Sequence, residues 1–69
     1  PPAEEYDKSI SYINSYLEKG GTNSDAYIML IDNWYNKKKN PDEALKIVQK
    51  AKTVYPNMTV FKQNELSIY

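Results

Sequence analysis

The fold is decided by residues 40–56, which read NPDEALKIVQKAKTVYP. Asn40 can cap a helix, Pro41 suits its first position, and Glu43 can return a hydrogen bond to the backbone N–H of the cap. Pro56 ends this helix or follows its end closely. Apolar residues then recur at helical spacing and predict an inner face made of Ala44, Leu45, Ile47, Val48, Ala51 and Val54.

A first helix is predicted before this stretch, because apolar residues recur at helical spacing at Tyr6, Ile10, Ile13 and Leu17. Gly20 and Gly21 end this helix, since glycine adopts the left-handed conformation at low cost. Tyr12 and Tyr16 form a neighbouring stripe, so the helix has apolar residues on two sides. Either a preceding helix or a second copy of the chain would cover that stripe.

Two further helices flank residues 40–56. The second helix is capped by Asn23 or Ser24 and ends at three lysines, and we expect it to be the most buried because apolar residues cover more than one of its faces: Tyr27, Ile28, Leu30, Ile31, Trp34 and Tyr35. The fourth helix is capped by Asn57 and carries a poorer pattern: Val60, Phe61, Leu66, Ile68 and Tyr69. We therefore predict a single all-α domain over residues 1–69, with about four antiparallel helices.

The composition excludes most catalytic chemistry. The chain has 69 residues, with nine Lys balanced by nine Asp and Glu, and it contains no Cys, His or Arg. It therefore lacks a thiolate nucleophile, an imidazole base and the usual ligands of zinc. Its carboxylates in first helical turns are explained by the helix dipole: Glu4, Glu5, Asp42 and Glu43. We expect no enzyme activity, no metal and no cofactor.

The same composition argues against two classes of partner. Zero net charge and the lack of Arg argue against a nucleic-acid surface and against an anionic membrane surface. No apolar run reaches transmembrane length. A protein or peptide partner is the remaining expectation.

The helices also repeat along the chain. A shift of 34 residues pairs Tyr27 with Phe61 and Tyr35 with Tyr69, a period typical of helical solenoids. The repeat resembles the tetratricopeptide repeat, whose pattern is matched in spacing by Ile28, Ile31, Asp32, Tyr35, Ala44, Val48 and Pro56. Of these, Tyr35, Ala44 and Pro56 also match in identity. The resemblance implies a fragment of an α-solenoid built from antiparallel helical hairpins.

In that scheme residues 4–19 form helix B of a preceding repeat, residues 25–58 form a full repeat, and residues 59–69 form helix A of a following repeat. Asp32 departs from the pattern, since a small residue is expected at a close helix contact and a buried carboxylate would need a partner. Lys39 replaces the usual turn glycine. Glu65 and Leu66 replace a large apolar and a small residue.

A second resemblance leads to a different function. The segment from Tyr27 to Asp32 also resembles the opening helix of a pentatricopeptide repeat, which would bind RNA. That interpretation accommodates Asp32 better. However, the spacing from Tyr27 to Ala44 differs by one residue from that of the pentatricopeptide repeat, and zero net charge disfavours RNA binding.

Tetratricopeptide A helices line a groove that binds peptides or partner helices. The resemblance places Ala26 in that groove, together with the expected binding residues Met29, Asn33, Asn36 and Lys37, and Asn64 on the next helix A. Asn33 and Asn64 match two positions of the family's carboxylate clamp, but Met29 occupies its lysine position, so we do not expect a clamp. Asparagine amides can bind a peptide backbone, and methionine adapts to varied apolar groups.

The resemblance therefore implies a protein–protein interaction or scaffolding module. Two alternatives stay open beside it. The chain can be a purely structural segment of a larger solenoid, or it can self-associate as a homodimer through exposed helix ends.

Overall fold

All regular structure in the described residues is helical. The computed structural model describes the backbone of residues 2–69 and the side chains of residues 4–69, so Pro1 of the expected domain lies outside the described residues. The elements are α1 (Pro2–Glu18), α2 (Asp25–Asp32), the π-helix η1 (Asn33–Lys37), α3 (Pro41–Val54) and α4 (Thr59–Ile68). The prediction of an all-α chain with four helices is confirmed.

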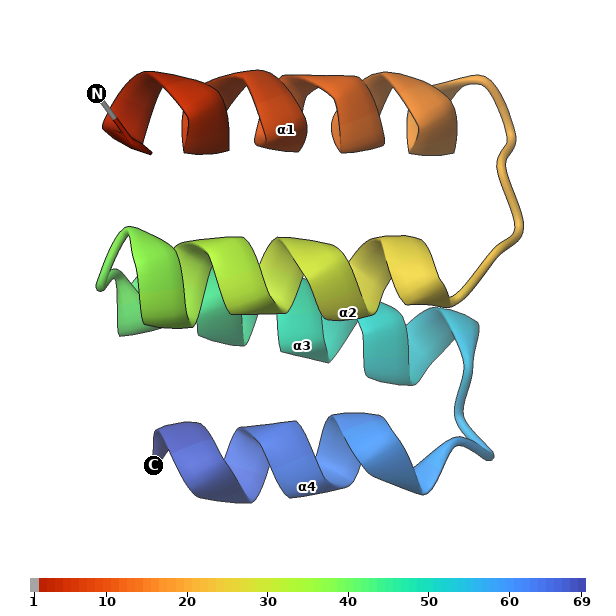
Figure 1. The fold of residues 1–69 in the computed structure, drawn as a ribbon. Coiled ribbons are helices and arrows are strands. Elements are labelled where there is room, and N and C mark those ends of the chain that lie inside the picture. The colour runs from red at the N-terminus through yellow and green to blue at the C-terminus, as the bar shows by residue number, and fades with distance from the viewer. Residues whose placement is uncertain (1) are drawn as a thin grey trace.

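The helices form a flat stack. Each helix runs antiparallel to the one before it, α3 lies behind α2, and α1 and α4 lie on either side of that pair (Figure 1). The Cα atoms extend over 36 × 30 × 14 Å. The shortest extent corresponds to two layers of helices, whose axes pack about 8–10 Å apart.

The turn between α1 and α2 explains both glycines. The N–H of Gly20 donates to the carbonyl of Leu17 (3.0 Å) and the N–H of Gly21 donates to that of Tyr16 (3.0 Å), as in a Schellman motif. Gly20 has φ +92°, in the left-handed region that glycine adopts most easily. Gly21 is needed for a different reason, because a Cβ there would overlap the ring of Tyr16.

The turn between η1 and α3 contains the predicted helix start. The Asn40 side chain accepts from the N–H of Glu43 (3.2 Å), and Pro41 is the first residue of α3. The prediction that the Glu43 carboxylate accepts from the N–H of Asn40 is wrong, because this N–H donates instead to the Trp34 carbonyl at 2.7 Å. The Glu43 carboxylate accepts instead from the Lys46 ammonium at 3.0 Å.

The wide last turn of η1 brings the Trp34 carbonyl within reach of the N–H of Asn40. The N–H of Lys38 donates to the carbonyl of Asn33, five residues earlier, as in a π-helix. Lys39 follows with φ 55°, an unfavourable conformation for a residue other than glycine. This is the position where the tetratricopeptide pattern has glycine.

The core consists of two clusters that meet along α2. The first joins α2, α3 and α4 through Tyr27, Ile31, Val48, Ala51 and Phe61, and the second joins α1 to α2 through Ile10, Ile13, Ala26 and Leu30. Leu17 and Ile47 are half-buried and pack against both clusters. The predicted inner face of α1 and the high burial of α2 are confirmed.

Aromatic rings close one end of the first cluster. The ring of Tyr27 meets those of Tyr55 and Phe61 edge to face, at centroid distances of 5.9 and 6.4 Å. The Tyr55 hydroxyl donates to the carbonyl of Thr22, in the loop before α2. Tyr55 therefore connects the α1–α2 loop to the segment between α3 and α4.

Several local expectations are corrected by the structure. Met58, not Asn57, is the N-cap of α4, and it contributes no side-chain hydrogen bond to the helix. Asp32 is exposed rather than buried, so it does not occupy a close helix contact. Val54, expected on the inner face of the third helix, is exposed instead, and so are Leu66 and Tyr69 from the apolar pattern of the fourth helix.

Candidate functional site

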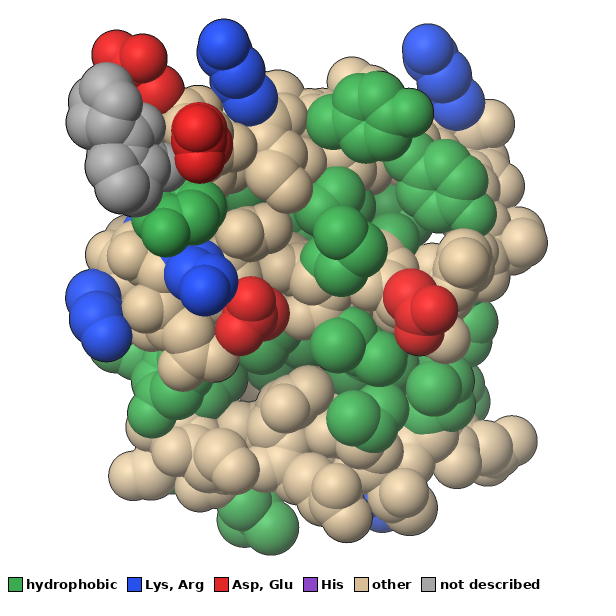
Figure 2. All heavy atoms as spheres, viewed as in Figure 1, with side chains coloured by type: hydrophobic (Ala, Val, Ile, Leu, Met, Phe, Trp, Pro, Cys, Tyr) green, Lys and Arg blue, Asp and Glu red, His purple; other side chains and the backbone are tan. Residues whose placement is uncertain are grey.

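The exposed strip of α2 consists of Asp25, Met29 and Asp32 and continues to Asn36 in η1. These residues follow one another at spacings of four, three and four, and all are exposed. Buried residues of α2 lie on either side of the strip, toward α1 at Ala26 and toward α4 at Tyr27. In Figure 2 the face over α1 and α2 carries hydrophobic side chains with acidic groups among them.

Met29 is the apolar centre of this strip. Its side chain is 51% exposed, although it lies in a helix whose neighbours Leu30 and Ile31 are buried. Asn36 is exposed about two turns away from Met29, and its amide nitrogen donates to the Asp32 carboxylate at 2.7 Å. Lys37 is exposed at the end of η1. Three of the predicted binding residues are therefore accessible on α2 and η1.

Asn33 does not share this exposed strip. It is only 9% exposed, and its amide nitrogen lies 3.4 Å from the Ser9 hydroxyl of α1. Ala26, which the resemblance also places in the groove, is buried against α1. The wider turn of η1 and the docking of α1 place Asn33 in an interhelical contact, so it cannot contact a peptide without displacing α1.

Asn64 lies on α4, where it is half-buried. Helix α4 contacts α2 through the Tyr27–Phe61 ring pair, and it contacts η1 through the Tyr35 hydroxyl, which donates to the Ser67 carbonyl at 3.4 Å. Among the described side chains, no hydrogen bond joins Asn64 to the predicted residues of α2 and η1. The five predicted residues thus fall into an accessible group of three, a buried one and a separate one.

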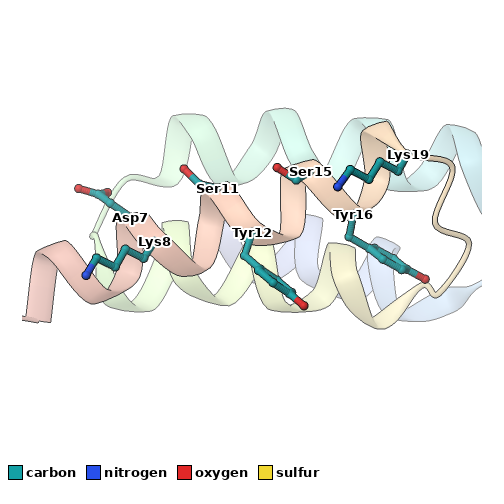
Figure 3. Close-up of a pocket in the computed structure, with 7 residues that line it drawn as sticks. All are labelled: Asp7, Lys8, Ser11, Tyr12, Ser15, Tyr16 and Lys19. Atoms are coloured by element: carbon teal, nitrogen blue, oxygen red, sulfur yellow. The ribbon is translucent and has the colours of Figure 1, made fainter.

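The structure adds a surface that the predicted site did not include. A shallow hollow follows one flank of α1 and is lined by Asp7, Lys8, Ser11, Tyr12, Ser15, Tyr16 and Lys19 (Figure 3). Tyr12 is 80% exposed and Tyr16 is 39% exposed, and Figure 3 shows both rings projecting from the same side of the helix. Their helical spacing was visible in the sequence, but it does not by itself distinguish an open surface from a covered one.

Charged groups stabilise the edges of the fold rather than a reactive centre. Lys38 pairs with Asp7 and lies over the Trp34 ring, 4.8 Å from its centroid. Between α3 and α4, the Lys52 ammonium lies 2.9 Å from the Glu65 carboxylate. That bond, with a second one from the Gln49 amide, lowers the pKa of Glu65 below its ordinary value of 4.5.

Within residues 2–69, the structure has no group of three or more His, Cys, Asp or Glu side chains placed to hold a metal ion. Along the same residues, no helix combines the length and the apolar character needed to cross a membrane.

Comparisons with protein-family models, with curated proteins and with solved structures found no match to this chain. The tetratricopeptide resemblance therefore rests on the sequence pattern within residues 25–58 alone.

Proposed function

We propose that the chain is a protein–protein interaction module that binds a peptide or a partner helix on the exposed strip of α2. The observation that carries the proposal is Met29, half exposed at the centre of the strip. A partly exposed methionine presents a flexible, polarizable apolar contact that suits varied side chains. The tetratricopeptide resemblance supports the same surface, because α2 corresponds to helix A.

The chemistry of the strip restricts the partner. Asp25 and Asp32 are exposed on either side of Met29, about one turn away in each direction. A peptide that places an apolar residue on Met29 would gain from Lys or Arg residues on both sides of it. Asn36 offers an amide at the end of the strip, although one of its hydrogens is used by Asp32.

A random peptide display library tests this function. We expect enrichment of peptides with an apolar residue next to basic residues, and about tenfold weaker binding by Met29→Ala, because interface centres dominate affinity. The matched control is Leu66→Ala, which removes an exposed apolar side chain from α4. Failure to enrich any peptide, or equal binding by Met29→Ala and the unmodified chain, would contradict the proposal.

The structural alternative is favoured by a separate observation. Leu66 on α4 is 76% exposed and Tyr69, directly after the end of α4, is 84% exposed, whereas the other face of α4 packs on α3. A following helix in a solenoid would cover such residues. This alternative predicts that Leu66→Gln changes association with flanking repeats in a longer chain and leaves peptide binding unchanged.

A further inference from the structure

One exposed stripe of α1 has a palindromic spacing. It is formed by Glu5, Lys8, Tyr12, Tyr16 and Lys19, so the steps are three, four, four and three residues, with Tyr12 at the centre. All five residues are exposed. At 100° per residue they occupy about 80° of the helix circumference, so they form one narrow surface. Lys19 keeps the helical path, since its N–H donates to the Ser15 carbonyl.

The stripe is complementary to itself when two copies meet antiparallel. With Tyr12 on the twofold axis, each residue faces the one at the same distance on the other side of Tyr12. Glu5 then faces Lys19 of the second copy, and Lys8 faces the Tyr16 ring of the second copy. Every contact occurs twice, as a twofold interface requires. We propose that the chain forms a homodimer through this stripe of α1.

The charged groups of the stripe are free to make these contacts. In the described part of the chain, the ion pairs join Lys38 to Asp7, Lys46 to Glu43 and Lys52 to Glu65, and none uses a residue of the stripe. Glu5 and Lys19 have opposite charge, so their alignment is attractive. A lysine over a tyrosine ring adds a cation–π contact.

Tyr16 is held in position before association. Its ring lies against Gly21, and its hydroxyl accepts from the N–H of Asn23 at 3.0 Å. Its exposed fraction of 39% leaves part of the ring open to the hollow in Figure 3. A fixed ring loses less conformational entropy on binding than a mobile one.

The same charges favour a twofold axis at Tyr12 over an axis between Ile13 and Asn14. If the twofold axis passed between Ile13 and Asn14, Lys8 would face Lys19 of the second copy, and like charges would repel at both ends of the interface. The opposite charges at the two ends of the stripe also favour a second copy over a uniformly acidic peptide. The contact involves one helix per copy, so we expect a small interface and a weak dimer.

Charge reversal gives the decisive test. Sedimentation equilibrium, up to about 1 mM chain, is expected to show a concentration-dependent dimer of the unmodified protein. Glu5→Lys and Lys19→Glu each create two repulsive pairs and are expected to weaken the dimer about tenfold or more, whereas the double variant restores attraction and affinity. Monomers at every concentration, or a double variant no stronger than the single ones, would overturn the proposal.

A cross-link tests the twofold axis independently. The chain has no cysteine, so Tyr12→Cys introduces a single thiol. On the proposed axis this thiol faces the same thiol of the second copy, within the short separation that a disulfide spans. Oxidation should link Tyr12→Cys chains much faster than Lys50→Cys chains, whose thiol is exposed on α3. Equal rates would contradict the axis at Tyr12. Circular dichroism of each variant checks that it remains helical.

This dimer does not depend on the function proposed for α2. Self-association needs no ligand, and its test residues lie on α1 or, for Lys19, directly after its end, whereas Met29 belongs to α2. Loss of peptide binding with an intact dimer would therefore count against the α2 proposal alone, and a monomeric chain that still binds peptides would count against the dimer alone.

Discussion

Gly21 lies under the ring of Tyr16, and this contact couples the end of α1 to the loop before α2. The ring can remain there only while residue 21 has no Cβ. The Tyr16 hydroxyl also accepts a hydrogen bond from the backbone of Asn23. One aromatic side chain therefore fixes both the direction of the loop and the surface of α1 beside it.

Gly21→Ala is expected to displace the Tyr16 ring and break its bond to Asn23, which costs about 1 kcal/mol of unfolding free energy. Urea denaturation measures this loss. In a Tyr16→Ala background the same substitution should cost much less, because the ring that the methyl group would meet is absent. Equal losses in both backgrounds would show that the ring contact is not the cause.

Glu65 makes the stability sensitive to acid. Its folded pKa lies below the ordinary value of 4.5, because it accepts from Lys52 and Gln49. Its stabilisation is therefore complete above about pH 4.5 and is lost as the pH falls through the folded pKa. Glu65→Gln should melt at a lower temperature than the unmodified chain near pH 7, and this difference should shrink in acid.

Thermal melts across that pH range test the assignment. Lys52→Gln serves as the matched variant, since it removes the cation that contributes most to the lowered pKa of Glu65. It should reduce the acid sensitivity in the same way. A difference between Glu65→Gln and the unmodified chain that stays constant with pH would contradict the role of the carboxylate.

At the scale of elements, the segment from α2 to α3 shows a helix that widens before it ends. The five residues of η1 form wider turns than α2, and the chain then passes through Lys39 with φ 55°. This turn presents the Trp34 carbonyl to the N–H of Asn40. The start of α3 is therefore held by a backbone bond as well as by its cap.

Lys39→Gly is expected to raise the unfolding free energy by about 0.5–1 kcal/mol, since glycine adopts a positive φ without the steric cost that lysine meets. Lys37→Gly is the matched control, because it places glycine inside the helix and should lower stability by about 1 kcal/mol. Chemical denaturation of both variants distinguishes a conformational effect from a loss of lysine charge, which would act in the same direction at both positions.

The helices themselves were predictable because their local patterns agree with their packing. The NPDE segment predicted the Asn40 cap and the start of α3, and the spacing from Tyr6 to Leu17 predicted the inner face of α1. The cap of α4 was missed, because Asn57 is a favourable capping residue but the turn places Met58 at that position. Competing bonds in a turn depend on its path, which residue type alone does not determine.

The candidate site was less predictable. Met29, Asn33 and Asn36 share one face of an ideal helix, but the widening at η1 begins at Asn33 and the docking of α1 buries it. Asp32, expected at a close contact, is exposed and bonds Asn36 instead. Spacing predicts which residues share a face, but the exposure of that face depends on the neighbouring helices.

At the scale of the whole molecule, α1 is attached differently from the other helices. It packs on α2 and η1 through its own cluster, whereas α3 lies between α2 and α4 and contributes two fully buried residues, Val48 and Ala51, to the larger cluster. Regions with fewer buried apolar contacts open more readily than the centre of a fold. We therefore expect α1 to open before α3.

Hydrogen exchange measured residue by residue should show protection factors in α1 at least about tenfold lower than those in α3. Measurements at two protein concentrations are needed, because a dimer through α1 would raise its protection as concentration rises. Equal protection in α1 and α3 at low concentration would show that the two clusters unfold as one unit.

Trp34 gives this arrangement an optical consequence. It is the single tryptophan of the chain, and it packs against the cluster that joins α1 to α2, with the Lys38 ammonium over its ring. Its fluorescence therefore reports the docking of α1, whereas far-ultraviolet ellipticity reports helix content along the entire chain. If α1 separates first, the emission spectrum will shift at a lower denaturant concentration than the ellipticity changes, and the molecule carries its own reporter of partial unfolding.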